Sequence, residues 1–144
     1  MKSVCVFLWM MLYSLSALAS GSESCPGIGD VTLRAGVYTA PANSAGSEWV
    51  AVASASPAAQ LTSFEMGVFY PENNQPGTVG RIGYCEYKTQ DQTRVNLHYG
   101  QRTAGEASMR LTQVENWNKV ESGLGLVVYE CTASTPGACS FAVP

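Results

Sequence analysis

The sequence predicts an all-β protein, a small antiparallel sandwich or barrel of about six to seven strands that disulfide bonds hold together, with at most one short helix. Two observations support this class. Apolar residues recur at every second position in several separate runs, as expected of strands with one buried face. Between the runs lie segments rich in Gly, Pro, Asn and Ser, which are typical of turns.

The period-two runs predict the strands in chain order. In the clearest run, Thr62, Phe64, Met66, Val68 and Tyr70 are alternate residues that we expect on one face. The other predicted strands cover 31–37, 49–53, 82–87, 95–99 and 124–131, and the loops between them cover 41–46, 54–59, 71–78, 90–92, 100–105 and 135–137.

Residues 108–122 fit two patterns. Met109 and Leu111 alternate as in a strand, whereas Leu111, Val114 and Trp117 recur as on one face of a helix. We expect a strand followed by a turn, with any short helix confined to 112–121.

The first nineteen residues are typical of a cleaved secretion signal. Lys2 is followed by an apolar run over 4–15, and Ala17-Leu18-Ala19 offers the small residues that a signal peptidase recognises. The run is shorter than the roughly 20 apolar residues of a membrane-spanning helix, and no cysteine follows directly for lipid attachment. We therefore predict a signal peptide at 1–19 and a single exported β domain at 20–144, periplasmic or secreted and without a membrane anchor.

Charge argues against nucleic acid as a partner. The full chain carries a formal charge of −3, and loss of Lys2 with the signal makes it −4, with no basic block or stripe. Neutralisation of phosphates by basic residues supplies most non-specific affinity for nucleic acids. No cofactor motif is present either, so we predict no cofactor.

Four cysteines remain after Cys5 leaves with the signal, and an even number in an oxidising compartment indicates two disulfides. Cys131 and Cys139 flank a Thr-Pro-Gly turn that brings them close at little entropic cost. This favours Cys131 with Cys139, and therefore Cys25 with Cys85; a bond from Cys85 to Cys131 is the alternative. A zinc site would need cysteine pairs at shorter spacing, so we predict no metal.

Several motifs occur in an order that resembles a known family. They are Cys25-Pro26, the Gly-Val-Tyr-Thr-Ala-Pro run at 36–41, Trp49, Cys85-Glu86-Tyr87, Trp117, Cys131 and Cys139-Ser140-Phe141. This order resembles an uncharacterised family of short exported bacterial proteins, the domain of unknown function 3757. The resemblance implies an exported bacterial setting and a structural role for the cysteines, and it implies no catalytic residue.

Catalysis has few candidate residues. His98 is the only histidine, and it alternates with apolar neighbours, so we expect it on the polar face of its strand. Glu86, Glu115 and Glu130 sit beside aromatic residues, and two carboxylates at suitable separation can hydrolyse a glycosidic bond. A small secreted hydrolase acting on cell-wall glycan is therefore the alternative function.

The preferred function is a non-catalytic exported binding protein of the inhibitor, immunity or envelope accessory type. Its partner would be a protein or an envelope component. Aromatic residues combine large apolar area with a polar atom, and loops on a rigid β scaffold commonly carry recognition. Tyr84 and Tyr87 lie on opposite faces of their strand, so one should be nearer solvent. The candidate binding residues are Trp49, Trp117, Tyr84, Glu72, Asn73 and Asn74.

Overall fold

The computed structural model describes residues 21–101 and 108–144. The predicted signal peptide and most of the predicted 100–105 loop lie outside the described residues. Within them the fold is all-β, with short 3-10 turns and no α-helix, and none of their helices is long and apolar enough to cross a membrane. The strands are β1 (Gly21–Ser24), β2 (Thr32–Arg34), β3 (Val37–Pro41), β4 (Ser47–Val52), β5 (Leu61–Pro71), β6 (Val79–Thr89), β7 (Arg94–Gln101), β8 (Met109–Leu111), β9 (Asn118–Glu121), β10 (Val127–Cys131) and β11 (Ser140–Val143).

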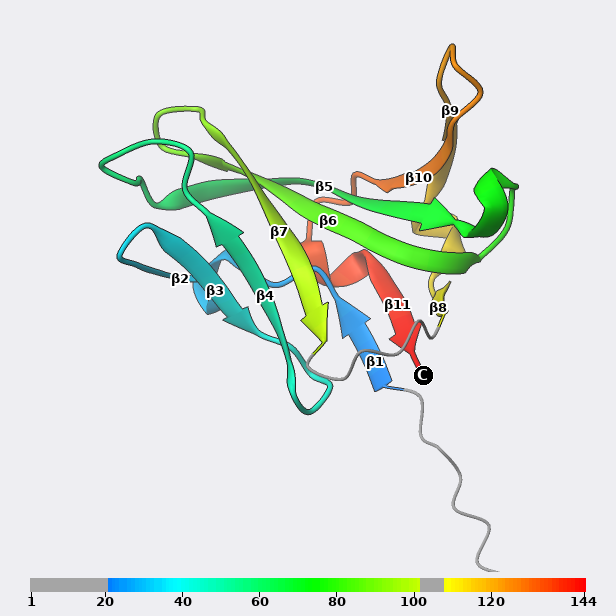
Figure 1. Cartoon of the computed structure of the whole chain (residues 1–144), viewed down its shortest axis with the longest axis horizontal. Coiled ribbons are helices and arrows are strands. Elements are labelled where there is room, and N and C mark those ends of the chain that lie inside the picture. Colours follow the sequence, from blue (N-terminus) through cyan, green and yellow to red (C-terminus); the bar gives the residue numbers. More distant parts are fainter. Residues whose placement is uncertain (1–20, 102–107) are drawn as a thin grey trace, which may run out of the picture.

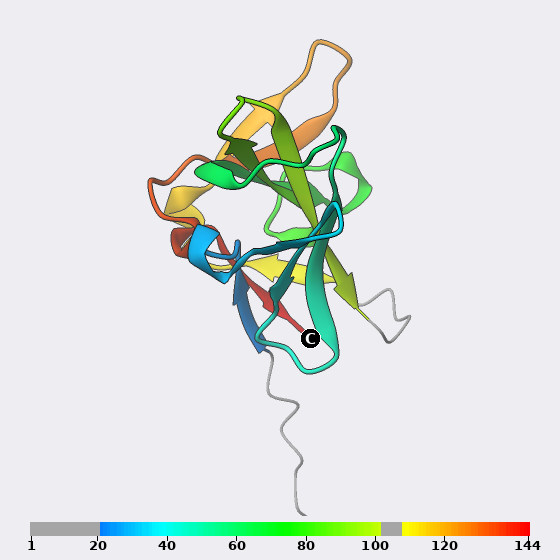
Figure 2. The ribbon, with the colours of Figure 1, turned by 90° about the vertical axis from the view of Figure 1, so that its left-hand side faces the viewer.

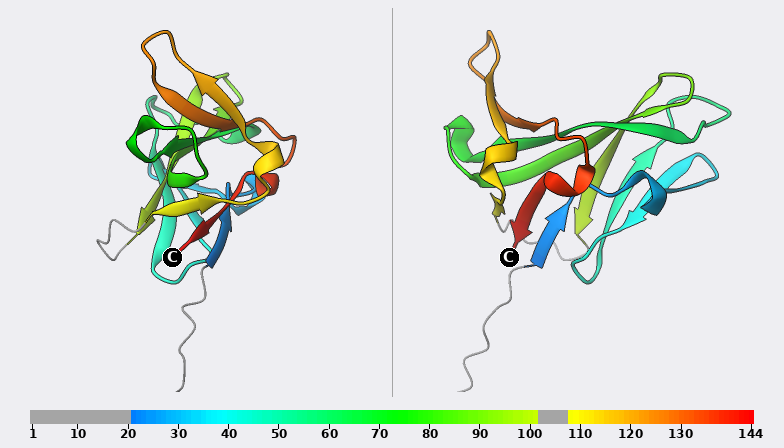
Figure 3. Two further views of the ribbon diagram at one scale, coloured as in Figure 1. Left: turned by 90° about the vertical axis from the view of Figure 1, so that its right-hand side faces the viewer. Right: turned by 180° about the vertical axis from the view of Figure 1, so that it is seen from behind.

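The long antiparallel pair β5 and β6 forms the centre of one curled sheet (Figure 1). On one side, β5 pairs with β10, and β10 pairs with β9. On the other side β6 changes partner along its length, because Val79 and Gly80 pair with β8 whereas 85–88 pair with β7. The sheet therefore divides at β6 into a branch β7-β4-β3-β2 and a branch β8-β11-β1, seen side by side in Figure 3.

The two branches curl toward each other into a half-barrel, and side chains connect them where the sheet hydrogen bonds stop (Figure 2). The turn between β3 and β4 lies against β1. There Asn43 Nδ2 donates to the Ser22 carbonyl oxygen at 3.0 Å, and the Ser44 amide donates to Glu23 Oε1 at 2.5 Å. The prediction of an antiparallel, disulfide-bonded β domain is confirmed, with about eleven strands in place of six to seven.

Bulges produce the curl and change which residues face inward. The pairing of β5 with β6 shifts register between Leu61 and Ser63, between Phe64 and Met66, and between Val68 and Phe69. Each extra residue reverses the alternation beyond it and bends the strand. Phe64 therefore faces the core, where it packs against Tyr87 with ring centroids 5.4 Å apart. The prediction that 62 to 70 present one uninterrupted face is wrong for this reason.

Tight turns account for part of the difference in strand count. Residues 31–37 are two strands rather than one, because Ala35 and Gly36 adopt positive φ values of 49° and 77° and reverse the chain. Two successive residues with positive φ form the turn that fits the twist of a two-residue hairpin. The 108–122 segment begins with the predicted strand, β8, and continues through the three-residue 3-10 turn η3 (Val114–Asn116) into β9.

The core fills the inside of the curl and is rich in aromatic residues. Buried tyrosines satisfy their hydroxyl groups internally, as buried phenols usually do. The Tyr87 hydroxyl donates to the Pro26 carbonyl and the Tyr38 hydroxyl to the Ala59 carbonyl, each at 2.5 Å. Burial raises the pKa of both phenols, and nearby acidic residues, Asp30 for Tyr87 and Asp91 for Tyr38, raise it further.

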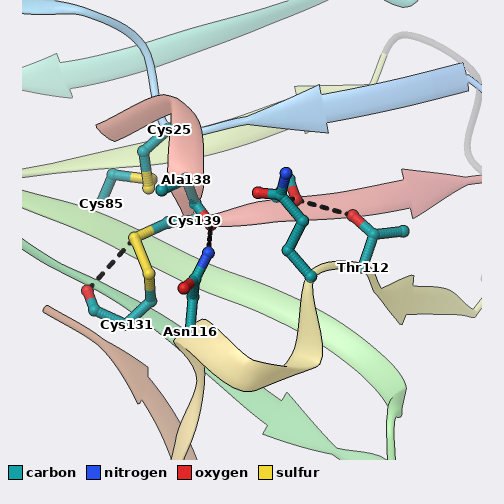
Figure 4. The surroundings of a disulfide bond; sticks show 9 residues. Cys25, Cys85, Thr112, Asn116, Cys131, Ala138 and Cys139 are labelled. Carbon is teal, nitrogen blue, oxygen red and sulfur yellow. Dashed lines mark hydrogen bonds between the residues drawn. A yellow bond between two sulfur atoms is a disulfide. The ribbon is translucent and has the colours of Figure 1, made fainter. Parts of the chain in front are cut away.

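Two disulfides join Cys25 to Cys85 and Cys131 to Cys139, which is the pairing that the sequence favours (Figure 4). All four sulfurs are used, so the zinc alternative does not apply. Both bonds approach Gly67 of β5: a Cβ atom there would lie 3.1 Å from Cys25 Sγ and 3.3 Å from Cys139 Cβ. A glycine lets the two disulfides pack against one strand.

Candidate functional site

The hairpin of β9 and β10 extends away from the body of the protein (Figure 1). Its tip carries Leu124, which is 99% exposed, and Leu126, which is also exposed. An isolated exposed leucine is ordinary, but a leucine at the end of a projecting hairpin can enter a pocket on another molecule. The sequence predicted a strand beginning at Leu124, whereas β10 begins at Val127.

Hydrogen bonds within the turn hold the tip in one shape. Ser122 Oγ accepts from the amides of Leu124 at 3.3 Å and Leu126 at 3.0 Å. The Ser122 amide donates to the Leu126 carbonyl, and the Gly125 amide donates to the Ser122 carbonyl, both at 2.9 Å. Because binding then orders little further backbone, a contact made by this tip loses little affinity to conformational entropy.

A second loop supports the hairpin from the side. Asn74, in the 3-10 turn η2 (Glu72–Asn74), donates from Nδ2 to the Gly125 carbonyl at 2.7 Å and accepts at Oδ1 from the Val127 amide at 2.6 Å. The Gly77 amide donates to the Tyr129 hydroxyl at 3.0 Å. Asn74 and Asn73 both have φ of 56°, a left-handed conformation that Asn tolerates.

The predicted loop residues therefore have different roles. Asn74 positions the hairpin, Asn73 is exposed, and the Glu72 carboxylate accepts a hydrogen bond from the Ser108 hydroxyl. The sequence identified this loop as a recognition candidate, but it did not show that the loop and the 122–126 tip lie together, since about fifty residues separate them.

The apolar side of the hairpin continues onto the sheet. Val120 pairs with Val128, Glu130 with Val68, and Val68 with Tyr84, and directly paired residues share a face. We call this the outer face; its apolar and aromatic residues are Val68, which is buried, Tyr70, Tyr84, Val120 and Val128, and it also carries Glu86 and Glu130. Tyr70 lies over Gly83, where an added Cβ would meet its ring at 2.4 Å.

Tyr84 is partly exposed on the outer face and Tyr87 is buried on the inner one. This agrees with the prediction that at least one of the two is nearer solvent, although the sequence did not indicate which. Partial burial raises the pKa of Tyr84, and Tyr70, Glu86 and Glu130 add to that effect. The ring contacts His98 edge to face, with centroids 6.0 Å apart. His98 is exposed and its Nδ1 lies 3.0 Å from the Gly83 carbonyl oxygen, in agreement with the predicted surface position.

The two tryptophans occupy the core and not the surface. Trp49 is 1% exposed and packs against Tyr99 and Phe141, with ring centroids 5.2 and 6.2 Å away. Trp117 is 5% exposed and packs against Phe69 at 6.1 Å. Neither can supply the exposed aromatic contact predicted for it, because each lies on the inner side of the curl.

The three carboxylates of the hydrolase alternative lie on three different elements, β6, η3 and β10. Glu86 is buried on the outer face, with Oε1 3.6 Å from Arg94 Nε. Glu130 lies on β10, and Glu115 is exposed in η3. A cleft lies between β1 and the β3–β4 turn, and none of these three glutamates is part of its lining. In residues 21–101 and 108–144, no three His, Cys, Asp or Glu side chains form a group suited to a metal ion.

Comparison with known proteins gives a family without an assigned activity. No curated protein and no solved structure matches the chain. One family model covers residues 20–142, which is most of the sequence, including all four disulfide-bonded cysteines, the hairpin and η2. The chain therefore belongs to the family described as protein of unknown function (DUF3757).

Proposed function

We propose that residues 20–144 form an exported, non-catalytic binding protein of the inhibitor, immunity or envelope accessory type, whose hairpin inserts Leu124 into an apolar pocket of a partner protein. The observation that carries this proposal is the full exposure of Leu124 on a tip that Ser122 and Asn74 hold rigid. Two disulfides support a location in the periplasm or outside the cell, where thiols are oxidised.

The shape of the tip favours a macromolecular partner. Small ligands bind in concave sites that enclose most of their surface, whereas this hairpin is convex and projects. Val120 and Leu126 extend the apolar area beside Leu124, and Tyr70 and Tyr84 continue it across the outer face. A protein with a complementary pocket could bury the tip first and then contact this flatter surface.

Burial of one leucine side chain contributes about 1.5–3 kcal/mol. Leu124→Asp should therefore weaken binding by more than about tenfold, since it also places a charge in an apolar pocket. The test is quantitative affinity capture with residues 20–144 as bait, from the envelope and culture fluid of the source cells. The captured partner is then purified and its affinity measured by calorimetry.

Val52→Asp is the matched control, because Val52 is likewise an exposed aliphatic residue, 76% accessible, but lies on β4 away from the hairpin. We expect Val52→Asp to retain the partner and Leu124→Asp to lose it. Equal affinity of the two variants would contradict the proposal. So would turnover of peptidoglycan by the pure protein that Glu86→Gln, Glu115→Gln or Glu130→Gln abolishes, since that result would establish the hydrolase.

A further inference from the structure

A cleft of about 450 Å³ lies between β1 and the turn that joins β3 to β4. This volume is within the range of about 300–1,000 Å³ that is usual for small-molecule sites. The cleft includes no residue of the hairpin or the outer face, so what it binds is independent of the function proposed above. Its lining residues include Glu23, Asp30, Asn43, Trp49, Pro26 and Pro41.

Glu23 is the unusual residue of this cleft. It is 2% exposed, and Oε1 of its carboxylate accepts a hydrogen bond from the Ser44 amide at 2.5 Å. Among the described residues no Lys or Arg lies within ion-pair distance of Glu23. Burial of a carboxylate is costly unless a positive charge or further donors compensate it. The second carboxylate oxygen has no such partner in the described part of the chain, although the side chain lines the cleft.

The position of Glu23 is held from both sides. Its strand pairs with β11, where Glu23 lies opposite Phe141. Across the cleft, Asn43 Nδ2 donates to the Ser22 carbonyl oxygen at 3.0 Å and keeps the β3–β4 turn against β1. The carboxylate is thus fixed between two elements.

The remaining lining indicates which chemistry fits. Asp30 and Pro41, which are both exposed, add a second carboxylate and an apolar ring, whereas the Trp49 indole, also in the lining, is only 1% exposed. None of the described residues that line the cleft is basic. A divalent cation such as Ca²⁺ takes 6–8 oxygen ligands, and the described residues contain no group of three acidic or other metal-binding side chains.

We propose that this cleft binds an organic cation on an apolar stem, the guanidinium or ammonium group of an arginine or lysine side chain in a peptide. The cation pairs with Glu23, its stem lies along the exposed Pro41, and the exposed Asp30 offers a second carboxylate. Arginine suits the site best, because its planar guanidinium can donate two hydrogen bonds to one carboxylate.

The test is an NMR titration of ¹⁵N-labelled residues 20–144 with N-acetyl-arginine amide. N-acetyl-citrulline amide, which has nearly the same shape and no charge, is the matched ligand. We expect saturable shifts of the Ser44 amide and the Trp49 indole with the arginine compound, and at least about tenfold weaker binding of the citrulline compound, since charge-assisted hydrogen bonds are roughly twice as strong as neutral ones. Binding of N-acetyl-lysine amide at the same resonances also supports the proposal.

Glu23→Gln can still accept from the Ser44 amide through its amide oxygen, so it should fold, and it should lose binding at least about tenfold. Glu48→Gln, an exposed carboxylate on the neighbouring β4, should bind as the unaltered protein does. If Glu23→Gln does not fold, Asp30→Asn serves in its place and should weaken binding severalfold. The proposal is overturned by unchanged affinity in the variants, by equal binding of citrulline and arginine compounds, or by resonances that respond to Ca²⁺ and to neither amino acid.

Discussion

Removal of the Cys25–Cys85 disulfide should destabilise the protein more than removal of the Cys131–Cys139 disulfide. The two bonds close loops of very different length, with sequence separations of 60 and 8 residues. In the chain-entropy model these closures contribute about 4 and about 2.5 kcal/mol to the free energy of unfolding. All four cysteines are 1% exposed or less, so replacement by alanine removes similar buried volume in each pair.

The difference between the two pairs is therefore the useful quantity, at about 2 kcal/mol in the chain-entropy model. The Cys25–Cys85 disulfide also connects two parts of the sheet, because Cys25 follows β1 and Cys85 lies in β6, where β6 begins to pair with β7. Without this bond, β1 and β11 keep the β8 pairing but lose a covalent connection to the central strands.

The assay is equilibrium unfolding in urea of two double variants, Cys25→Ala with Cys85→Ala and Cys131→Ala with Cys139→Ala, with the free energy obtained by linear extrapolation. The slope with denaturant should be compared as well, since a changed slope reports a change in the unfolded ensemble. A Cys131→Ala/Cys139→Ala variant as destabilised as the other, or more so, would refute the reasoning that loop length determines the difference.

Four further changes have definite expected results. Gly67→Ala should cost about 1–3 kcal/mol, measured in urea, because its Cβ would press on Cys25 Sγ and the Trp117 ring, each 3.1 Å away, whereas Gly77→Ala has open space and should cost little. Asn74→Ala should speed amide exchange at Val127, while Asn73→Ala, which has the same φ of 56°, should not; equal exchange in both would mean that the two Asn74 hydrogen bonds do not hold the hairpin. Hydrogen bonds from Thr89 and Thr93 lower the pKa of Asp91 below its ordinary value of 3.8. The stability that this carboxylate contributes is therefore present above pH 3.8 and is lost as the pH falls through the lowered pKa. Asp91→Asn should remove this part of the acid dependence, measured by urea unfolding at a series of pH values. His98→Ala should change the free energy of unfolding by less than about 1 kcal/mol and leave partner capture intact, and a large loss of any activity with the fold preserved would favour the enzyme alternative.

Local sequence patterns predicted the elements whose signal is local. Alternation marked the long strands β5, β6 and β7, since a strand half buried in a sheet needs apolar residues at every second position. The Thr-Pro-Gly turn predicted the Cys131–Cys139 bond, because closing a short loop costs little entropy. Short strands such as β1, β9 and β11 have only four residues, too few for alternation to be recognised.

Tertiary structure decided which face of each strand is inside and which distant segments meet. Three register shifts in β5 and β6 reverse the alternation, and nothing in the residue pattern marks where an extra residue bulges. Both faces of β6 carry a tyrosine, and only the direction of the curl left Tyr84 partly outside and Tyr87 inside. The same curl buries Trp49 of β4 and Trp117, which follows η3. The contact of Asn74 with the 125–127 backbone, and the cleft around Glu23, depend on residues far apart in the chain. The sequence by itself determined a disulfide-bonded β domain with a candidate loop at 71–78, while the support of the tip by Asn74 and the burial of the Glu23 carboxylate exist only because the fold brings segments distant in sequence together.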